Sequence, residues 1–344
     1  MSDDFRGQRL LVVAVRFFDY EQAVVRRLRE RGAEVDFYDD RPSNSVVVKG
    51  LIRFDRRLLH WQIRRYYRRL LARVKTKNYD YFLLIKGEAV PQWFLKEIRT
   101  LNPGMVCIGY TFDSVSEHGY FKTIGKAMDR VFTFDRADAL RENWGFRPLF
   151  FLEDYRRAGS VVAERKWDVV MVGTAHTDRY RVGEAVKSAA ERLALRSFFY
   201  YYAPGKFYFR LRRWFDRNLS AFDLKKLSFQ KLAHGQILEL YAQTCAVLDI
   251  NKPYQNGLTM RTFEVLAASR KLLTFNADVV NYPFYSPQNI KVLDRENPVL
   301  DRSFFTTPFE PIPEEALHYM TLDAWLDALF FEDQQTYWEQ KRQP

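Results

Sequence analysis

The segment from Ala246 to Phe275 constrains the fold more than any other part of the sequence. A short apolar run, Ala246–Ile250, leads into a polar loop and then into a helical stretch that begins near Gly257–Thr259. A second apolar run, Leu272–Phe275, follows. This order predicts a strand–helix–strand unit of a parallel sheet. Ligands bind at the carboxyl ends of the strands in such sheets, so the loop after the first strand is predicted to face a ligand.

The start of this helix carries residue types that suit a nucleotide diphosphate. Its first amides lack partners within the helix and favour an anion. Arg261 and Glu264 are three residues apart and share a face. The Glu264 carboxylate can accept hydrogen bonds from two neighbouring hydroxyls, as on a ribose. An Arg and a Glu at this spacing are also common as an exposed ion pair of little energetic value. Their position behind a strand and a glycine-containing loop favours the binding site.

Strands and helices alternate along the rest of the chain. At 344 residues the chain exceeds one typical domain, so two domains are expected. The alternation predicts an α/β fold with doubly wound parallel sheets. The polar stretch Glu153–Trp167 is predicted to be the inter-domain linker. The apolar runs predict strands at residues 9–15, Glu34–Tyr38, Tyr81–Ile85, Met105–Tyr110, Arg130–Phe134, Leu149–Phe151, Asp168–Val172, Arg196–Tyr201 and Asn289–Leu293, and helices at Tyr20–Arg31, Pro91–Leu101 and Leu317–Gln340.

Two motifs resemble the donor domain of GT-B glycosyltransferases, especially bacterial enzymes of the CgeB-like and "glycosyl transferases group 1" kind. The first motif is made of Gly257, Arg261, Phe263, Glu264, Ala267 and Ala268, and the second of Asp168–Thr174 with Arg179. The resemblance covers residues 165–295. It implies two Rossmann-like domains that face each other across a cleft, and a C-terminal helix that crosses back. The implied domains are 1–155 for the acceptor, 165–315 for the nucleotide-sugar donor, and 316–344 packed back on the first domain.

The resemblance also implies a function and a set of donor-binding residues. The expected reaction moves a sugar from a nucleotide-diphosphate sugar to a glycan or lipid-linked acceptor in bacterial cell-surface polysaccharide or lipopolysaccharide synthesis. Many retaining members have two glutamates eight residues apart, but Asn256 stands eight before Glu264 here, so inversion and retention both stay open. The expected donor-binding residues are Gly173, Thr174, Arg179, Asn251, Tyr254, Asn256, Gly257, Leu258, Thr259, Arg261 and Glu264.

An inverting transferase needs a base to take the proton from the acceptor hydroxyl. Three carboxylates follow predicted strands of the first domain and are the candidates: Asp113, then Asp19, then Glu88. Each has an alternative structural role as a helix cap. Asp19 precedes the helix at Tyr20, Asp113 precedes Ser114–Glu117, and Glu88 precedes the helix from Pro91.

The chain is basic, with a formal net charge of +11, and two segments concentrate the charge. Arg53–Lys77 and Lys206–Lys231 are both predicted to be helical, with aromatic residues between the basic ones. They suit an anionic partner such as a membrane surface, a lipid-diphosphate acceptor or nucleic acid. In the alternative reading, the leucines and isoleucine of the first segment form the buried stripe of an ordinary helix. That stripe would consist of Leu58, Leu59, Ile63, Leu70 and Leu71.

The remaining composition further limits the classes of protein to which the chain can belong. Two cysteines without metal-ligand spacing indicate a reducing cytoplasm, and no apolar run reaches the roughly 18–20 residues of a spanning helix. We therefore expect a cytoplasmic protein, peripheral at the inner face of the plasma membrane. The sequence has no Asp-x-Asp pair, so no metal or separate cofactor is expected. The first strand lacks a G-x-G-x-x-G turn, which disfavours a dehydrogenase. A nucleic-acid-binding protein and a non-catalytic GT-B scaffold remain as alternatives.

Overall fold

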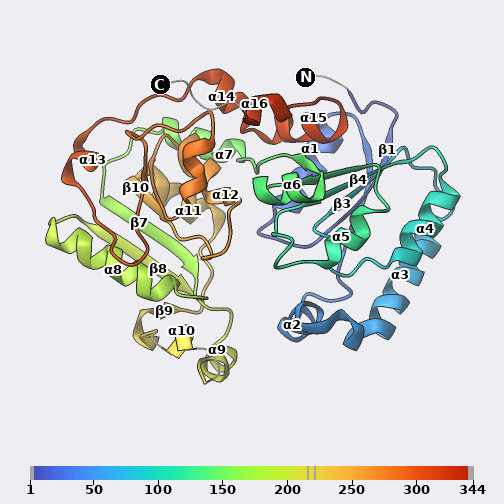
Figure 1. The fold of residues 1–344 in the computed structure, drawn as a ribbon, viewed down its shortest axis with the longest axis horizontal. Helices are drawn as coiled ribbons and strands as arrows, with labels where there is room; N and C mark the ends of the chain where they lie inside the picture. Colours follow the sequence, from blue (N-terminus) through green and yellow to red (C-terminus); the bar gives the residue numbers. More distant parts are fainter. Residues whose placement is uncertain (1–3, 215–216, 221, 340–344) are drawn as a thin grey trace. The chain divides into compact units, whose positions relative to one another are not determined.

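The computed structural model describes residues 4–214, 217–220 and 222–339. The chain divides into two compact units (Figure 1). Within the described residues, unit 1 consists of 4–148 and 325–335, and unit 2 of 149–324 and 336–339. The predicted domain limit at residue 155 falls within unit 2. The predicted C-terminal segment 316–344 is divided between the units, and its residues 340–344 lie outside the described part.

Unit 1 is built on a parallel six-stranded sheet. Its strands lie in the order β2-β1-β3-β4-β5-β6. The central strands are buried along most of their length, as expected for a sheet that helices cover on both faces. The strands are β1 (Arg9–Ala14), β2 (Glu34–Asp39), β3 (Tyr81–Ile85), β4 (Val106–Thr111), β5 (Arg130–Thr133) and β6 (Gly145–Phe146).

The helices of unit 1 bury apolar residues spaced three and four apart. On one face of the sheet, Ile63, Tyr67 and Leu70 pack with Phe94 and Phe82 in one hydrophobic core. The helices are α1 (Tyr20–Glu30), α2 (Val46–Asp55), α3 (His60–Val74), α4 (Gln92–Leu101), α5 (Tyr120–Gly125) and α6 (Arg136–Glu142), with a 3₁₀ turn η1 (Arg56–Leu59) between α2 and α3.

Unit 2 has a second parallel six-stranded sheet. Its strand order is β12-β11-β10-β7-β8-β9. β7 is the longest strand, and it pairs with β8 on one side and with β10 on the other. The strands are β7 (Trp167–Thr174), β8 (Ser197–Tyr202), β9 (Leu227–Ser228), β10 (Thr244–Asp249), β11 (Lys271–Thr274) and β12 (Ile290–Val292).

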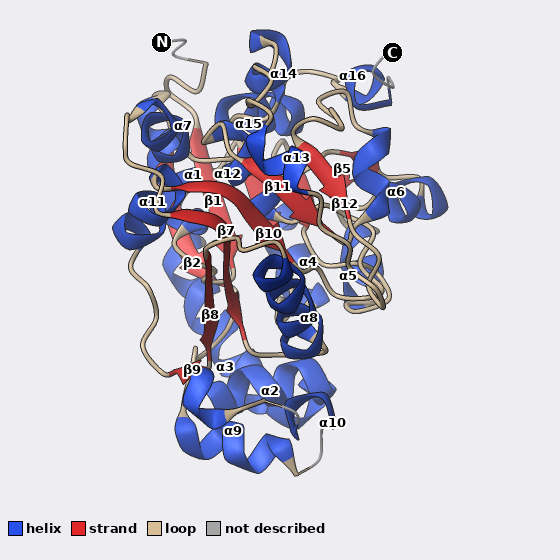
Figure 2. Cartoon of the chain, turned by 90° about the vertical axis from the view of Figure 1, so that its left-hand side faces the viewer, coloured by secondary structure: helices blue, strands red, loops and turns tan. Residues whose placement is uncertain are grey.

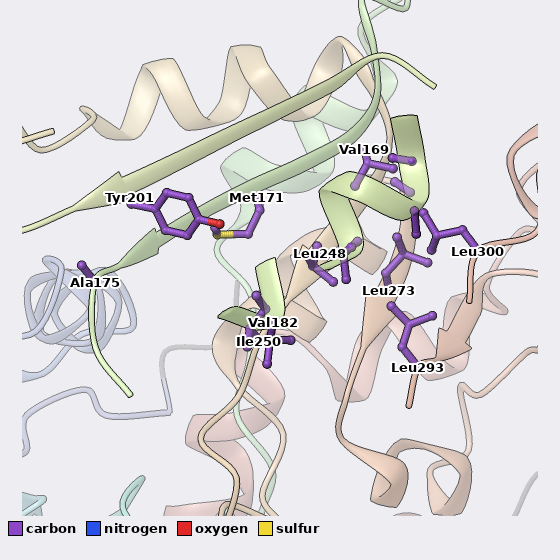
Figure 3. Close-up of a cluster of buried hydrophobic side chains, with 14 of the residues drawn as sticks. Val169, Met171, Ala175, Val182, Tyr201, Leu248, Ile250, Leu273, Leu293 and Leu300 are labelled. Atoms are coloured by element: carbon purple, nitrogen blue, oxygen red, sulfur yellow. The ribbon is translucent and has the colours of Figure 1, made fainter. Parts of the chain in front are cut away.

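Helices also cover the sheet of unit 2. Figure 2 shows α8 beside β8. Its Val182 packs with Met171 of β7 and Leu248 of β10 in the core drawn in Figure 3. The helices of this unit are α7 (Glu153–Ser160), α8 (Arg179–Arg192), α9 (Lys206–Arg213), α10 (Arg217–Ser220), α11 (His234–Ala242), α12 (Met260–Ala267), α13 (Arg302–Thr306), α14 (Glu314–Tyr319) and α16 (Gln335–Glu339), and α15 (Leu322–Phe330) continues the chain from unit 2 into unit 1.

Two predicted features near the junction of the units are wrong. Leu149–Phe151 is not a strand of the sheet, because β6 ends two residues before Pro148, which has no amide hydrogen to extend a ladder. Glu153–Trp167 is not an irregular linker. It contains α7, whose Tyr155 and Ala158 are buried three residues apart on one face, against α11 and α12.

Three long predicted helices are interrupted. Arg53–Lys77 is divided by η1 between the end of α2 and α3. Lys206–Lys231 contains α9, α10, a 3₁₀ turn and β9, and its residues 215–216 and 221 lie outside the described part. Leu317–Gln340 is divided among α14, α15 and α16. A new helix begins where Thr321 Oγ1 accepts the amide of Ala324, and another where Asp333 accepts the amide of Gln335. Gln340 lies outside the described residues.

Each sheet has a topological switch point near its centre. In unit 1 the strand order changes direction between β1 and β3, and in unit 2 it changes between β7 and β10. Loops leave the carboxyl ends of such neighbouring strands towards opposite faces, which creates the usual ligand-binding crevice of open α/β sheets. The loop Asn251–Thr259 follows β10 and therefore lies at the switch point of unit 2.

Candidate active site

Arg179 joins the two central strands of unit 2 at this switch point. Its Nη1 donates to Thr174 O at 2.9 Å, and its Nη2 donates to Ile250 O at 2.7 Å. Thr174 ends β7 and Ile250 follows β10, so one side chain spans the carboxyl ends of both strands. Gly173 leaves room for it, because a Cβ at that position would lie 2.9 Å from Arg179 Nη1.

Asp249, the last residue of β10, holds the start of α12. Its buried carboxylate accepts a hydrogen bond from Thr259 Oγ1 at 2.6 Å and lies 3.5 Å from Arg261 Nη1. Glu264 is buried one turn further along the helix. The Nε of Arg261 is buried without a hydrogen-bond partner among the described residues. A buried unsatisfied donor of this kind is typical of a site that binds water or a ligand.

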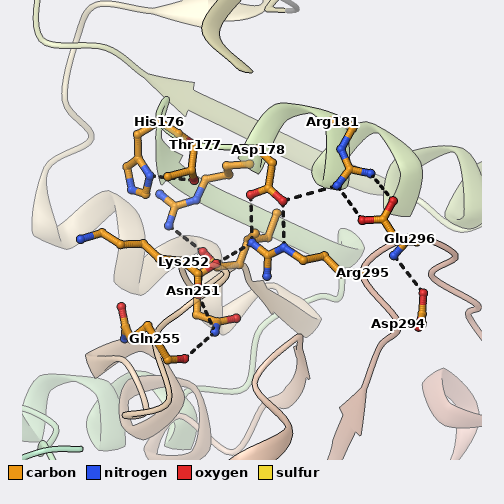
Figure 4. A network of polar contacts seen from close by, with 12 residues as sticks. His176, Thr177, Asp178, Arg181, Asn251, Lys252, Gln255, Asp294, Arg295 and Glu296 are labelled. Atoms are coloured by element: carbon orange, nitrogen blue, oxygen red, sulfur yellow. Dashed lines mark hydrogen bonds and ion pairs between the residues drawn. The ribbon is translucent and has the colours of Figure 1, made fainter. Parts of the chain in front are cut away.

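A third arginine, Arg295, reaches the same edge from the loop after β12 (Figure 4). It forms a two-point ion pair with Asp178, with distances of 2.8 and 2.9 Å. The same guanidinium donates to Asn251 O at 2.8 Å. The Asn251 side chain donates from Nδ2 to Gln255 O at 3.0 Å. The loop after β10 is therefore tied to α8 and to the loop after β12.

The guanidinium groups at this edge influence one another. Burial, and then the positive charge of Arg261, lower the pKa of Arg179 to about 10. Burial opposes the charged form of Arg261 as well. Tyr241, Asp249 and Glu264 outweigh that effect, so the pKa of Arg261 is raised. A bound anion would relieve the repulsion between the two arginines, and the edge is therefore suited to a phosphate group.

The structure brings most of the predicted donor-binding residues to this edge, with different exposures. Asn251, Gly257 and Leu258 are buried, whereas Tyr254 and Asn256 are exposed. The buried residues shape the loop, and the exposed ones present side chains at its surface.

Four residues of this edge were missed by the sequence reasoning. Asn276 donates from Nδ2 to Asn256 O at 2.8 Å and so supports the loop before α12. Asp178, Asp249 and Arg295 are the others. Each of the four ends a strand, follows one within a few residues, or precedes a helix at the carboxyl edge. This position in the sequence is the signal by which they could have been predicted.

Unit 1 has a second polar group at its own switch point, around Lys86. Lys86 Nζ lies 2.6 Å from Asp113 Oδ2 and 2.8 Å from Glu88 Oε1. Glu88 Oε2 accepts from Arg41 Nε at 2.5 Å. The backbone of Lys86 is left-handed, with φ of 76°, and Gly87 follows with φ of 63°. Left-handed backbone costs a residue with a Cβ roughly 1–2 kcal/mol.

The carboxylates of Glu88 and Asp113 differ in environment. Glu88 is buried, and both of its oxygens contact cations. Burial alone would raise the pKa of Glu88, but Lys86 and Arg41 outweigh it and lower the pKa well below its usual range. Asp113 keeps 23% of its side chain exposed. Of these two carboxylates, Asp113 is the one that solvent or a substrate can reach.

Asp19, the third candidate, lies in the loop after β1 and is exposed. Its backbone is left-handed, with φ of 66°, and its side chain makes no capping hydrogen bond to α1. The carboxylate of Glu21 instead accepts the amide of Phe17 at 3.0 Å. The Phe17 ring lies 5.0 Å from that of Phe112 and 4.7 Å from that of Phe18. Three aromatic rings therefore gather at this edge of unit 1.

The structure does not bear out the helix-capping roles considered for Glu88 and Asp113. Asp113 precedes a turn, and α5 begins only at Tyr120. The helix after Glu88 begins at Gln92 and has no side-chain cap. Asp40 accepts the amides of the two residues that follow Glu88, at 2.9 Å each.

The sequence matches no known family model and no curated protein. Solved structures resemble it in fold. The trehalose 6-phosphate synthase of Burkholderia multivorans aligns with a TM-score of 0.59 and 12% identity, over 93% of this chain and 95% of the other. The lipopolysaccharide outer core galactosyltransferase WaaB aligns with a TM-score of 0.53 and 9% identity, over 94% and 99%. Anabaena HepE, solved with UDP and glucose, aligns with a TM-score of 0.53 and 9% identity, over 92% and 97%.

These likenesses, at low identity, show the fold. The chain has the two-domain α/β fold of GT-B glycosyltransferases, as its two parallel sheets indicate. The fold predicted from the two sequence motifs is therefore confirmed. The structures found do not distinguish the CgeB-like group from other GT-B proteins, so that narrower resemblance stays a prediction.

In the described part of the chain, no helix combines the length and the apolar character needed to span a bilayer.

Proposed function

We propose that the protein is a glycosyltransferase that uses a nucleotide-diphosphate sugar as donor. The observation that carries the proposal is the convergence of Arg179, Arg261 and Arg295 with the start of α12 at the switch point of a GT-B donor-type sheet. The solved structures of the same fold add support, since one of them was obtained with UDP and glucose.

The donor-binding residues divide into two groups in this proposal. Arg261 and the first amides of α12 contact the diphosphate, and Arg179 supplies a fixed positive charge while it holds the strand ends. Glu264 accepts hydrogen bonds from the ribose hydroxyls. The exposed Tyr254 and Asn256 contact the sugar or the diphosphate.

The chemical step needs charge stabilisation and a base. An acceptor hydroxyl oxygen forms a bond to the anomeric carbon, and the bond from that carbon to the diphosphate oxygen breaks. The electron pair of that bond leaves with the diphosphate, where the arginines and the helix amides stabilise the negative charge. We assign Asp113 as the group that takes the hydroxyl proton if the reaction inverts the anomeric centre. Lys86 orients that carboxylate through their 2.6 Å contact.

The rings at the edge of unit 1 support an acceptor that contains sugars. Phe17 and Phe18 are 37% and 54% exposed, and sugar rings stack on exposed aromatic faces. We propose a glycan or lipid-linked acceptor of bacterial cell-surface polysaccharide or lipopolysaccharide synthesis. Phe18→Ala is expected to raise the KM for the acceptor and to leave donor affinity unchanged. An unchanged acceptor KM would remove this residue from the acceptor site.

The test of the proposal is a calorimetric and thermal-shift screen against UDP, GDP, CDP, ADP, dTDP and CMP, with NAD and duplex DNA as controls. One nucleotide is expected to stabilise the protein selectively. Glu264→Ala should weaken the binding of that nucleotide by about 1.5–3 kcal/mol, the range for a hydrogen bond to a charged group. Glu239→Ala, at an exposed position of α11, is the matched control. Failure of every nucleotide to bind, or full affinity in Glu264→Ala, would overturn the donor assignment.

The screen also separates the alternatives. Binding of duplex DNA alone, with a steep dependence on salt, would favour a nucleic-acid-binding protein. Donor binding without transfer would favour a GT-B scaffold. We further propose a cytoplasmic protein that is peripheral at the inner face of the plasma membrane.

A further inference from the structure

The segment of unit 1 that contains α2, η1 and α3 carries apolar residues on its exposed side as well as on its buried side. The inner face consists of buried residues, among them Ile52, Leu59, Ile63 and Tyr67, which belong to the core beneath the sheet. This face accounts for the amphipathic pattern of an ordinary surface helix. The predicted buried stripe is wrong at Leu58, which points to solvent.

The outer face carries large apolar side chains that no core explains. Phe54 is 86% exposed, Leu58 60% and Trp61 78%. Phe54 lies near the end of α2, Leu58 in η1 and Trp61 near the start of α3, so all three belong to the turn between the two helices. Val47, near the start of α2, is also exposed. Single exposed apolar residues are ordinary on soluble surfaces, whereas several large ones at one turn of the chain indicate an interaction site.

Exposed arginines lie close to these apolar residues in the chain. The side chain of Arg57 is 91% exposed, and Arg65 and Arg68 are exposed at one and two turns after Trp61. From residue 46 to residue 77 the sequence has eleven Lys and Arg residues and a single acidic residue, Asp55. We name Phe54, Arg57, Leu58, Trp61, Arg65 and Arg68 the α2–α3 surface.

We propose that the α2–α3 surface binds the protein to a bilayer that contains anionic lipids. Trp and Phe side chains favour the boundary between headgroups and acyl chains, and arginines beside them attract anionic headgroups. Aliphatic side chains such as Leu58 and Val47 enter acyl chains but give nothing to a phosphate backbone or a base. That difference favours a bilayer over a nucleic acid. The inference rests on the peripheral location proposed above and names the surface that makes the contact. It does not depend on the glycosyl transfer, so either can fail without the other.

The proposed attachment is at the membrane interface. Helices of this kind lie in the plane of the interface with their apolar side chains inserted, and they do not cross the bilayer. Each basic residue close to an anionic surface strengthens binding roughly fivefold. The three arginines of the surface therefore contribute roughly a hundredfold, and the three apolar side chains supply the insertion.

The experiment measures sedimentation of the full chain with vesicles. One set contains phosphatidylglycerol with phosphatidylethanolamine, and the other contains phosphatidylcholine alone. One variant changes the apolar side chains, Phe54→Ser, Leu58→Ser and Trp61→Ser, and a second changes the basic ones, Arg57→Glu, Arg65→Glu and Arg68→Glu. The matched controls are Leu140→Ser and the triple variant Arg26→Glu, Lys96→Glu and Lys126→Glu, all at exposed positions of unit 1.

Wild type and both controls are expected to sediment with the anionic vesicles and not with phosphatidylcholine. The charge variant should lose roughly a hundredfold or more in affinity, and the apolar variant at least tenfold, with unchanged thermal unfolding. The proposal is overturned if wild type does not bind anionic vesicles, or if both test variants bind as wild type does. Binding of single-stranded or duplex DNA through the same residues, without binding to vesicles, would also overturn it. Bound protein should show a blue shift of tryptophan emission that is smaller in Trp61→Phe.

Discussion

Lys86 Nζ lies between two of the three carboxylates proposed as bases, 2.6 Å from Asp113 Oδ2 and 2.8 Å from Glu88 Oε1. The pairing of β3 with β4 sets this relationship, because Ile85 is the register partner of Tyr110 and the loops after both strands begin side by side. The lysine is buried, and these two carboxylates compensate the cost of burying its ammonium group. The arrangement separates a buried structural carboxylate from a partly exposed one, and this separation leads to the first two predictions.

Asp113→Asn is expected to lower glycosyl transfer by roughly 10²–10⁴-fold, the usual contribution of a general base. Nucleotide affinity in unit 2 should not change. Transfer is measured as release of the nucleoside diphosphate, and affinity by calorimetry. Asp19→Asn, at the exposed loop after β1, serves as the comparison. Wild-type turnover in Asp113→Asn would eliminate Asp113 as the base. A large loss of transfer in Asp19→Asn alone would instead assign the role of base to Asp19.

Glu88→Gln is expected to destabilise the protein by about 3–5 kcal/mol at neutral pH, because it leaves the buried Lys86 and Arg41 without their shared carboxylate. The loss should depend on pH. The pKa of Glu88 is lower in the folded protein than in the unfolded chain, so its ionised form stabilises the fold at pH values above about 4.3. That contribution is lost as the pH falls further towards the folded pKa.

Denaturant unfolding at a series of pH values tests this. Wild type should lose more stability than Glu88→Gln as the pH falls from neutral into the acid range. Parallel curves for the two proteins would contradict the ion-pair role of Glu88.

Gly173→Ala is expected to fold but to bind the nucleotide less tightly. The new methyl group would lie 2.9 Å from Arg179 Nη1 and displace the guanidinium from Thr174 O. We expect a loss of about 1.5–3 kcal/mol in nucleotide affinity, as for a charged hydrogen bond. Gly205→Ala is the matched control, since a Cβ there meets nothing within 4 Å. Equal nucleotide affinities in both variants would argue against Arg179 as part of the donor site.

Gly159→Ala should destabilise unit 2 without any effect on ligand contacts. A Cβ at Gly159 would lie 2.6 Å from the backbone of Ala268, where α7 packs against the end of α12. Overpacking of this kind costs about 1–3 kcal/mol. Gly235→Ala, in a helix with open space around the position, should instead gain about 0.5–1 kcal/mol. Thermal unfolding of both variants checks the contrast, and a neutral Gly159→Ala would show that the two helices can separate slightly.

Donor binding and transfer are expected to persist in EDTA. The proposed site stabilises the diphosphate with arginines and amides, so a divalent cation is not needed for charge. Loss of transfer in EDTA that Mg²⁺ or Mn²⁺ restores would show a metal requirement.

The longer strands of both sheets were predictable because their apolar runs end at glycine, proline or polar turns, whereas the two-residue strands β6 and β9 were missed. Tyr81–Ile85 is a strand with the predicted limits. Helix α7 was missed because its exposed residues are polar and only Tyr155 and Ala158 are buried. The interruptions in the last helices depend on side-chain acceptors that begin a new helix. Thr321 accepts the amide of Ala324 near the start of α15, and Asp333 accepts the amide of Gln335 at the start of α16.

The site was predictable only in part, for a physical reason. Arg261 and Glu264 are close in sequence and share a helix face, so their association follows from spacing. The contact between Arg179 and Ile250 O joins residues 71 positions apart, and strand order decides it. The contact of Lys86 with Asp113 depends in addition on left-handed backbone at Lys86, which no sequence pattern indicates for a lysine.

The link from Arg179 to Ile250 also has a consequence for the expected order of folding. A chain made from its N-terminus presents β7 and α8 long before β10 exists. Until β10 inserts beside β7, the Arg179 guanidinium lacks one of its two carbonyl acceptors. Closure of that long loop is entropically costly, so we expect this edge of the sheet to form late. A nucleotide present during synthesis would bind only the finished sheet, and it would slow unfolding without speeding the early steps.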